Sequence, residues 1–140
     1  MKTPIVADSS SLVSLASITD SNHKRAVQIS TDIQKENFQL IIPGEVLTET
    51  TNTIGKKVGH QEAFGTATQI MKSSEIAVID TNQNIRKNAL QKFQNQPESV
   101  SFTDCLVMSF ADEYKTKLIF AFDKAFKKNG YIRFGVDNQD

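Results

Sequence analysis

The sequence has one cysteine, no long apolar run and no excess of charge of either sign. The single cysteine, Cys105, cannot form an internal disulfide. No apolar run approaches the roughly 20 residues that a membrane helix needs, and the apolar run at the N-terminus is too short for a signal peptide. We therefore expect a cytoplasmic protein in a reducing setting, with no membrane segment.

The charges balance, with 16 lysines and arginines against 16 aspartates and glutamates. The whole-chain charge therefore gives no electrostatic argument for nucleic-acid binding, and any such binding depends on local patches. The clearest basic patch is Lys124, Lys127 and Lys128, and Lys56 with Lys57 is a second. A solvated helix face explains either patch equally well.

The length of 140 residues predicts one domain over 1–140, large enough to hold a core without disulfides or structural metal. We find no internal repeat, low-complexity tract or linker. Apolar patterning predicts strands at 5–7, 38–42, 76–79, 118–122 and 131–134. It predicts helices at about 10–17, 26–33, 45–57, 60–72, 83–94 and 103–114, and a short one from Lys124. This alternation predicts an α/β fold of three layers, with a mostly parallel sheet between helices.

Four acidic residues lie where the strands end or the following helices begin. Asp8 directly follows the first predicted strand, and Asp123 directly follows the strand at 118–122. Glu49 and Asp104 lie near the starts of two helices. Because functional groups in an open parallel sheet gather beyond the carboxyl ends of the strands, we expect these four carboxylates to meet in one crevice.

Carboxylates that share a crevice raise one another's pKa unless a cation neutralises them. Magnesium and manganese prefer oxygen ligands and keep several bound waters, which suits hydrolysis of a phosphodiester. If two ions bind, they would lie about 4 Å apart and contact both the attacking and the leaving oxygen. The pattern therefore indicates a metal-dependent reaction at phosphate.

Each acid also has a purely structural interpretation. Asp8 and Asp123 can be N-caps of the helices that follow them. Asp104 lies three residues after Ser101, which is the spacing of a capping box, and Glu49 can be an exposed polar residue on a helix. Spacing alone leaves these alternatives open.

Four motifs together resemble the PIN domains, and among them the VapC-like ribonuclease toxins of prokaryotic toxin–antitoxin modules. The first motif is a strand that ends in an acid and is followed two residues later by serine, here Asp8 and Ser10. The second lies in Leu40-Ile41-Ile42-Pro43 and Val46-Leu47-Thr48-Glu49-Thr50. The third, Ser101-Phe102-Thr103-Asp104 opening an apolar helix, is the most specific. The fourth is Phe120-Ala121-Phe122-Asp123-Lys124-Ala125-Phe126, with Gly130-Tyr131 after it.

The resemblance implies an endoribonuclease that uses Mg²⁺ or Mn²⁺, and it covers nearly the whole chain. It implies that the ligands of the metal are Asp8, Glu49, Asp104 and Asp123, with Ser10 and Thr103 as auxiliary residues. Glu45 is the alternative for the second acid, and Asp123 can act through water. The resemblance further implies an RNA substrate, a homodimer, and a small antitoxin protein that covers the site.

Two other functions compete with this interpretation. The first is a PIN-like module with an inert acidic cluster that only binds a partner protein. The second is a phosphotransfer domain, which needs a second aspartate at the place that Ser10 occupies and a phosphate loop that the sequence lacks. Cys105, His23 and His60 lack the neighbours of a nucleophile or metal site, and we give them no role.

Overall fold

A computed structural model describes residues 2–137 of the chain. Its five strands are β1 (Thr3–Ala7), β2 (Phe38–Pro43), β3 (Ile76–Ile79), β4 (Leu118–Phe120) and β5 (Ile132–Arg133). Its helices are α1 (Ser9–Ala16), α2 (His23–Lys35), α3 (Gly44–Lys57), α4 (His60–Lys72), α5 (Gln83–Gln94), α6 (Phe102–Glu113) and α7 (Lys124–Lys128). No helix within residues 2–137 is long and apolar enough to cross a membrane.

The strands form one sheet in the order β3-β2-β1-β4-β5, and every pairing is parallel. The chain moves outward from β1 to β2 and β3, and then returns to the other side of β1 to add β4 and β5. The direction therefore reverses between β1 and β4. In open α/β sheets such a reversal opens a crevice at the carboxyl ends of the two strands.

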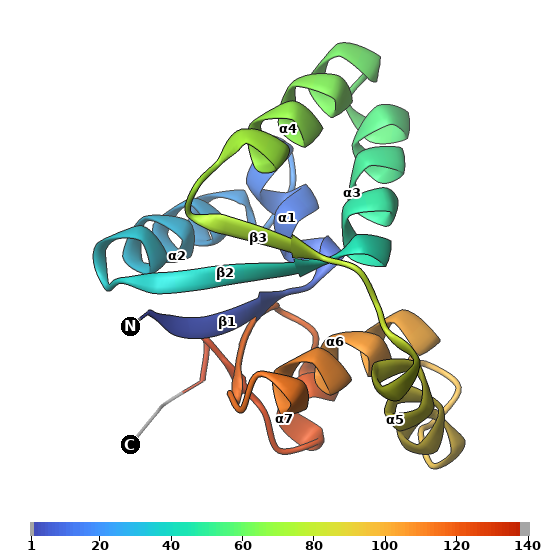
Figure 1. Cartoon of the computed structure of the whole chain (residues 1–140). Helices are drawn as coiled ribbons and strands as arrows, with labels where there is room; N and C mark the ends of the chain where they lie inside the picture. The colour runs from blue at the N-terminus through green and yellow to red at the C-terminus, as the bar shows by residue number, and fades with distance from the viewer. Residues whose placement is uncertain (1, 138–140) are drawn as a thin grey trace.

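The reversal also sets the layers. Right-handed crossovers place the helices of the first half, α1–α4, on one face of the sheet and those of the second half, α5–α7, on the other. Figure 1 shows α1, α3 and α4 above the strands as drawn, and α5, α6 and α7 below them. The predicted α/β fold with a parallel sheet flanked by helices is confirmed.

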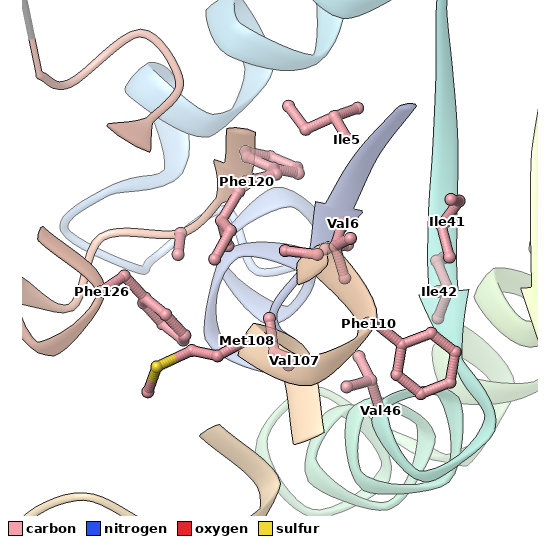
Figure 2. Close-up of a cluster of buried hydrophobic side chains, with 14 of the residues drawn as sticks. Ile5, Val6, Ile41, Ile42, Val46, Val107, Met108, Phe110, Phe120 and Phe126 are labelled. Carbon is pink, nitrogen blue, oxygen red and sulfur yellow. The ribbon is translucent and has the colours of Figure 1, made fainter. Parts of the chain in front are cut away.

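The core joins the sheet to the helices of both faces (Figure 2). Three phenylalanines from α6, β4 and α7 are fully buried: Phe110, Phe120 and Phe126. Burying a side chain of this size stabilises the fold by about 1.5–3 kcal/mol relative to leaving it exposed. The three place α6, β4 and α7 in one rigid body with β1, and this fixes the elements that carry three of the predicted site residues.

Two strand predictions were too long. The strand predicted at 118–122 ends at Phe120, and the one predicted at 131–134 is confined to Ile132–Arg133. The cause is the length of the partner strand: β1 ends at Ala7, which pairs with Phe120, so residues after Phe120 have no β1 partner. Asp123 therefore lies three residues beyond the end of the strand rather than directly after it.

Candidate functional site

Asp8 lies at the reversal of the sheet. It follows β1 directly, and its backbone N–H donates to the carbonyl oxygen of Phe120 in β4 at 3.1 Å. Its side chain is 4% exposed, and its Oδ2 accepts a hydrogen bond from Ser10 Oγ at 2.6 Å. Asp8 occupies the N-cap position of α1, but its side chain makes no cap hydrogen bond. The capping interpretation is therefore wrong for this carboxylate.

The surroundings of Asp8 oppose its ionisation. Burial raises its pKa to about 6, with further increases from the negative charges of Asp104 and Glu49. The hydrogen bond from Ser10 and one from the Ser9 backbone act in the opposite direction and favour the charged form. A buried carboxyl whose pKa is raised toward neutrality, beside other acids, is typical of a functional site rather than of a structural cap.

Asp104 lies in the first turn of α6 and is half-buried. It forms the predicted capping box: its backbone N–H donates to Ser101 Oγ at 3.0 Å, and its Oδ2 accepts from the Ser101 backbone N–H at 3.0 Å. The structural interpretation is thus confirmed here. It does not exclude a second role, because the carboxylate keeps a free acceptor oxygen when only one oxygen is used by the cap.

The pKa of Asp104 is raised too. Burial is the main cause, the two Ser101 hydrogen bonds act against it, and the charges of Asp123 and Glu49 raise it further. Asp104 therefore interacts electrostatically with each of the other three acids, since its own charge also raises the pKa of Asp8. We call the group, made of Asp8, Glu49, Asp104 and Asp123, the acidic cluster.

Glu49 is an exposed residue of α3, and its side chain reaches Ser9 at the start of α1. Its Oε1 accepts a hydrogen bond from Ser9 Oγ, across 40 residues of sequence. Glu45, one turn earlier, is engaged elsewhere: it accepts from Thr81 Oγ1 at 2.5 Å and pairs with Arg86 Nη2 at 3.6 Å. Of the two glutamates, Glu49 is the one whose charge acts on Asp8 and Asp104.

Asp123, like Glu49, is an exposed member of the acidic cluster. It is the N-cap of α7, where its Oδ1 accepts from the Ala125 backbone N–H at 2.8 Å, so the predicted cap is confirmed. The residue before it, Phe122, has its carbonyl oxygen held by Arg133 Nη1 at 2.6 Å. Arg133 in β5 therefore fixes the segment from which Asp123 projects.

Carboxylate oxygens alone make up the acidic cluster, which is the donor chemistry that Mg²⁺ and Mn²⁺ prefer. The pKa values of Asp8 and Asp104 are raised by burial and further by neighbouring carboxylates, so a cation there would relieve repulsion. The side chains do not converge on one point: within residues 2–137 no three His, Cys, Asp or Glu side chains are arranged to hold one ion. Each acid instead accepts its own hydrogen bond.

Several residues of this site were not anticipated from the sequence. Ser9 and Arg133 contact Glu49 and the Phe122 carbonyl from distant elements, and no local pattern marks either of them. Ser10, named as an auxiliary residue, donates to Asp8, and Thr103 lies half-buried in the first turn of α6 beside Asp104. The role of Thr103 stays a prediction. Cys105 is fully buried, as expected of a core thiol.

Comparisons with known proteins bear on the family and the fold. The sequence profile of the PIN domain family matches residues 5–130. No curated protein matches the chain in sequence. Among solved structures, VapC20 of Mycobacterium tuberculosis, described as a sarcin-ricin loop cleaving toxin, superposes with a TM-score of 0.80 at 21% identity. The match covers 92% of this chain and 97% of that one. At this identity the likeness shows a shared fold.

Proposed function

Since the chain belongs to the PIN domain family, we propose that it is a metal-dependent endoribonuclease and the toxin of a toxin–antitoxin module. The observation that carries the proposal is the buried Asp8 at the reversal of the sheet, with its pKa raised to about 6. A purely structural acid has no reason to be placed where its charge is opposed by burial and by two other carboxylates. The confirmed family and the fold of VapC20 support the same conclusion.

The residues of this chain divide the work as follows. Asp8, Glu49 and Asp104 would hold a Mg²⁺ or Mn²⁺ ion, and the exposed Asp123 would act directly or through a water. Such an ion supplies activation of water and stabilisation of the charge that develops on phosphate. Ser10 orients the Asp8 carboxylate by its 2.6 Å hydrogen bond and favours its ionised form.

The hydrogen bonds of Glu49 and Asp104 each engage one carboxylate oxygen. Oε1 of Glu49 accepts from Ser9 and Oδ2 of Asp104 accepts from Ser101, so each side chain keeps a second oxygen that could serve as a ligand. The capping box therefore fixes Asp104 in place while leaving it able to act as a ligand. We expect both side chains to be held in place before an ion binds, Asp104 by the capping box and Glu49 by Ser9.

The partners that we propose follow from the family and the named relative. VapC20 is described as a toxin, and a VapC-like protein implies an antitoxin partner. We propose a homodimer, an antitoxin that covers the acidic cluster, and the cytoplasm as the compartment where the RNA substrate is met. The substrate class that we propose is RNA, without a choice among transfer, ribosomal and messenger RNA.

The test is cleavage of a mixed cellular RNA pool by the purified chain, with Mg²⁺, Mn²⁺ or EDTA, beside the Asp104→Asn variant. Cleavage that requires the metal and disappears in the variant supports the proposal. No cleavage by folded protein that binds no divalent ion would favour the alternative, a PIN-like module with an inert acidic cluster that only binds a partner protein. Thermal unfolding of both proteins, run in parallel, shows that the variant is folded.

A further inference from the structure

A polar groove opens beside the acidic cluster, between α3 and the segment that joins β3 to α5. Its volume is about 740 Å³, and Glu49 belongs both to its wall and to the acidic cluster. The groove is lined by Gly44, Glu45, Thr48, Glu49, Asn52, Thr53, Lys56, Asp80, Thr81 and Arg86. The mechanism above uses only Glu49 among these residues. The rest of the groove therefore lies outside the acidic cluster, and the proposed mechanism does not explain its presence.

One wall of the groove is a stripe along α3. Glu45, Glu49, Asn52 and Lys56 recur at intervals of three or four residues, so they share one face of the helix. Lys56 lies about 10 Å along the helix axis from Glu49, at a rise of about 1.5 Å per residue. The Lys56 ammonium group is therefore too far from the acidic cluster to pair with it, but a polymer that passes over the acidic cluster can contact Lys56.

The other wall comes from the end of β3 and the start of α5. It approaches α3 closely at its base, because a Cβ added to Gly44 would lie 3.4 Å from Asp80 Oδ1. Arg86 lies on this wall with its side chain 51% exposed, and its Nη1 donates to the Thr81 carbonyl oxygen at 3.1 Å. That hydrogen bond anchors the guanidinium at the rim while leaving it accessible from the groove.

The pair between Arg86 and Glu45 is weak. The distance from Arg86 Nη2 to Glu45 Oε2 is 3.6 Å, and both side chains are substantially exposed. Pairs of this kind contribute about 0–1 kcal/mol. An incoming phosphate, which accepts two hydrogen bonds from a guanidinium, can therefore replace Glu45 at little cost. Glu45 keeps its hydrogen bond from Thr81 when this happens.

The chemistry of the lining suits the sugar–phosphate backbone of a nucleic acid rather than its bases. Two cations, Lys56 and Arg86, are interleaved with neutral hydrogen-bonding side chains: Thr48, Asn52, Thr53 and Thr81. The lining also holds three carboxylates, and they lie toward the end of the groove away from Lys56: Glu49 belongs to the acidic cluster, Glu45 is held by Thr81 and Arg86, and Asp80 lies beside Gly44. Among residues 2–137 no aromatic side chain lines the groove, so this part of the chain offers no platform there on which a base can stack. Contacts of this type position a polynucleotide and carry no direct sequence information.

The depth of Asp8 decides between single and double strands. Asp8 is 4% exposed and precedes Ser9, whose hydroxyl donates to Glu49 in the groove wall, so the bond to be cleaved has to reach a buried carboxylate. A flexible single strand can bend from the groove wall down to that position. An A-form duplex holds its phosphodiesters on the outside of a regular helix, so its backbone cannot bend down to a carboxylate buried at this depth.

We propose that the polar groove is the binding site for the backbone of single-stranded RNA on one side of the cleaved bond, with Lys56 and Arg86 as its phosphate contacts. This inference rests on the proposed ribonuclease function and specifies where its substrate lies. Lys56 belongs to a basic pair visible in the sequence, and the structure gives the two members different surroundings. Only Lys56 lines the groove; its neighbour Lys57 does not.

The test uses the full chain carrying Asp104→Asn, which the proposed function predicts to be inactive, and measures binding of a short fluorescein-labelled single-stranded RNA of mixed sequence by anisotropy. In this background Lys56→Gln and Arg86→Gln are compared with Lys57→Gln and Lys87→Gln, which remove the same charge from neighbouring exposed positions outside the groove. Thermal unfolding of each variant confirms that it is folded. A duplex RNA of the same sequence is the control ligand.

Each groove variant is expected to weaken single-strand binding about tenfold, the effect of losing a charged contact worth about 1.4 kcal/mol. It should also lower the slope of log affinity against log salt by about 0.7, the value for one phosphate contact on a single strand. The two control variants should change affinity less than about twofold, as expected of exposed charges. Equal effects of groove and control variants, or a preference for the duplex, would overturn the proposal.

The result stays separate from the test of the proposed function. Selective loss of binding in the groove variants together with no cleavage by the unmodified chain would keep the groove and reject the nuclease. Cleavage by the unmodified chain together with equal binding by all four variants would keep the nuclease and reject the groove. The two measurements therefore fail independently.

Discussion

Arg133 donates a hydrogen bond of 2.6 Å from its Nη1 to the carbonyl oxygen of Phe122, the residue before Asp123. Its guanidinium is held in turn by Asp137, at 2.7 Å from Nη2 and 3.1 Å from Nε. Both side chains are largely buried, at 11% and 7% exposure. Charge-assisted bonds of this kind are stronger than neutral ones, so they fix the turn between β4 and α7.

The first prediction concerns this contact. Arg133→Gln should lower kcat for RNA cleavage about ten- to hundredfold with little change in KM, because Asp123 shifts while the groove is untouched. It should also destabilise the fold by about 1–3 kcal/mol, since Asp137 is left buried without its partner. Steady-state kinetics and urea unfolding measure the two effects.

The double variant Arg133→Gln/Asp137→Asn separates the effect on kcat from the effect on stability. Replacing both partners should restore most of the stability, because no charge is left unpaired, while kcat stays low. Lys127→Gln is the matched control. Lys127 also faces Asp137, but its side chain is 66% exposed and the distance from Nζ to Oδ1 is 3.9 Å, so this pair is weak. A kcat that recovers together with stability would show that Arg133 acts on the fold alone.

The second prediction is that Asp8→Asn stabilises the protein at neutral pH while abolishing cleavage. The pKa of Asp8 is raised from 3.8 to about 6, so below about pH 4 its carboxyl is protonated in both states and has no effect on stability. Between pH 4 and 6 the folded state keeps a proton that the unfolded chain has lost, and the free energy of unfolding falls as pH rises. Above pH 6 the loss is complete, at most about 3 kcal/mol.

Urea unfolding at several pH values measures this difference. The variant should exceed the unmodified chain in stability at pH 7.5, and the two should converge near pH 4. Asparagine can still accept the hydrogen bond from Ser10, so that contact is retained. A variant that is less stable at pH 7.5 would indicate that the Asp8 carboxylate is structural.

A third prediction follows for metal binding. Mn²⁺ should raise the unfolding temperature at pH 7.5 by several degrees, since a ligand that binds only the folded state stabilises it. The increase should shrink at pH 5, where a proton occupies Asp8, whose pKa is about 6, and competes with the metal. Differential scanning fluorimetry gives the temperatures. Asp8→Asn should lose the response, and an equal response in that variant would place the ion elsewhere.

The capping box allows the two roles of one hydrogen-bonded pair to be separated, which is the fourth prediction. Ser101→Ala should destabilise the protein by about 1 kcal/mol, the usual effect of losing an N-cap side chain, and keep most of the cleavage activity. Asp104→Asn should abolish cleavage and keep most of the stability, because its amide oxygen can still accept from the Ser101 backbone N–H. Parallel losses of stability and activity in both variants would support the capping role alone.

The sequence predicted much of this fold because its boundaries are local. The helices His60–Lys72 and Gln83–Gln94 and the strand Ile76–Ile79 begin and end as predicted. Glycine precedes the first helix, and the Asn82 side chain accepts from the Ile85 backbone N–H at the start of the second. Signals of this kind lie within a few residues of the boundary that they mark.

The predicted end of the strand at 118–122 was wrong because that boundary is not local. Its end depends on β1, more than a hundred residues away, which ends at Ala7 and so stops the pairing at Phe120. The same limit applies to the site. The four acids were named from their places after strands and at helix starts, whereas Ser9 on Glu49 and Arg133 on the Phe122 carbonyl depend on tertiary contacts that no local pattern encodes.

The last prediction separates the two glutamates of α3. Glu49→Gln should abolish cleavage, because it removes a charge that acts on both Asp8 and Asp104. Glu45→Gln should keep full activity and change stability by less than about 1 kcal/mol, since its ion pair with Arg86 is long and exposed. Cleavage of a labelled RNA and thermal unfolding, measured on both variants, make the comparison.

Glu45→Gln should also tighten the binding of single-stranded RNA, because Arg86 loses the carboxylate that competes with phosphate for its guanidinium. Glutamine can still accept the hydrogen bond from Thr81, so the groove wall keeps its shape. Glu45 would then limit affinity for RNA while Glu49 serves the reaction itself. Loss of cleavage in Glu45→Gln with activity retained in Glu49→Gln would reverse this assignment and make Glu45 the second acid.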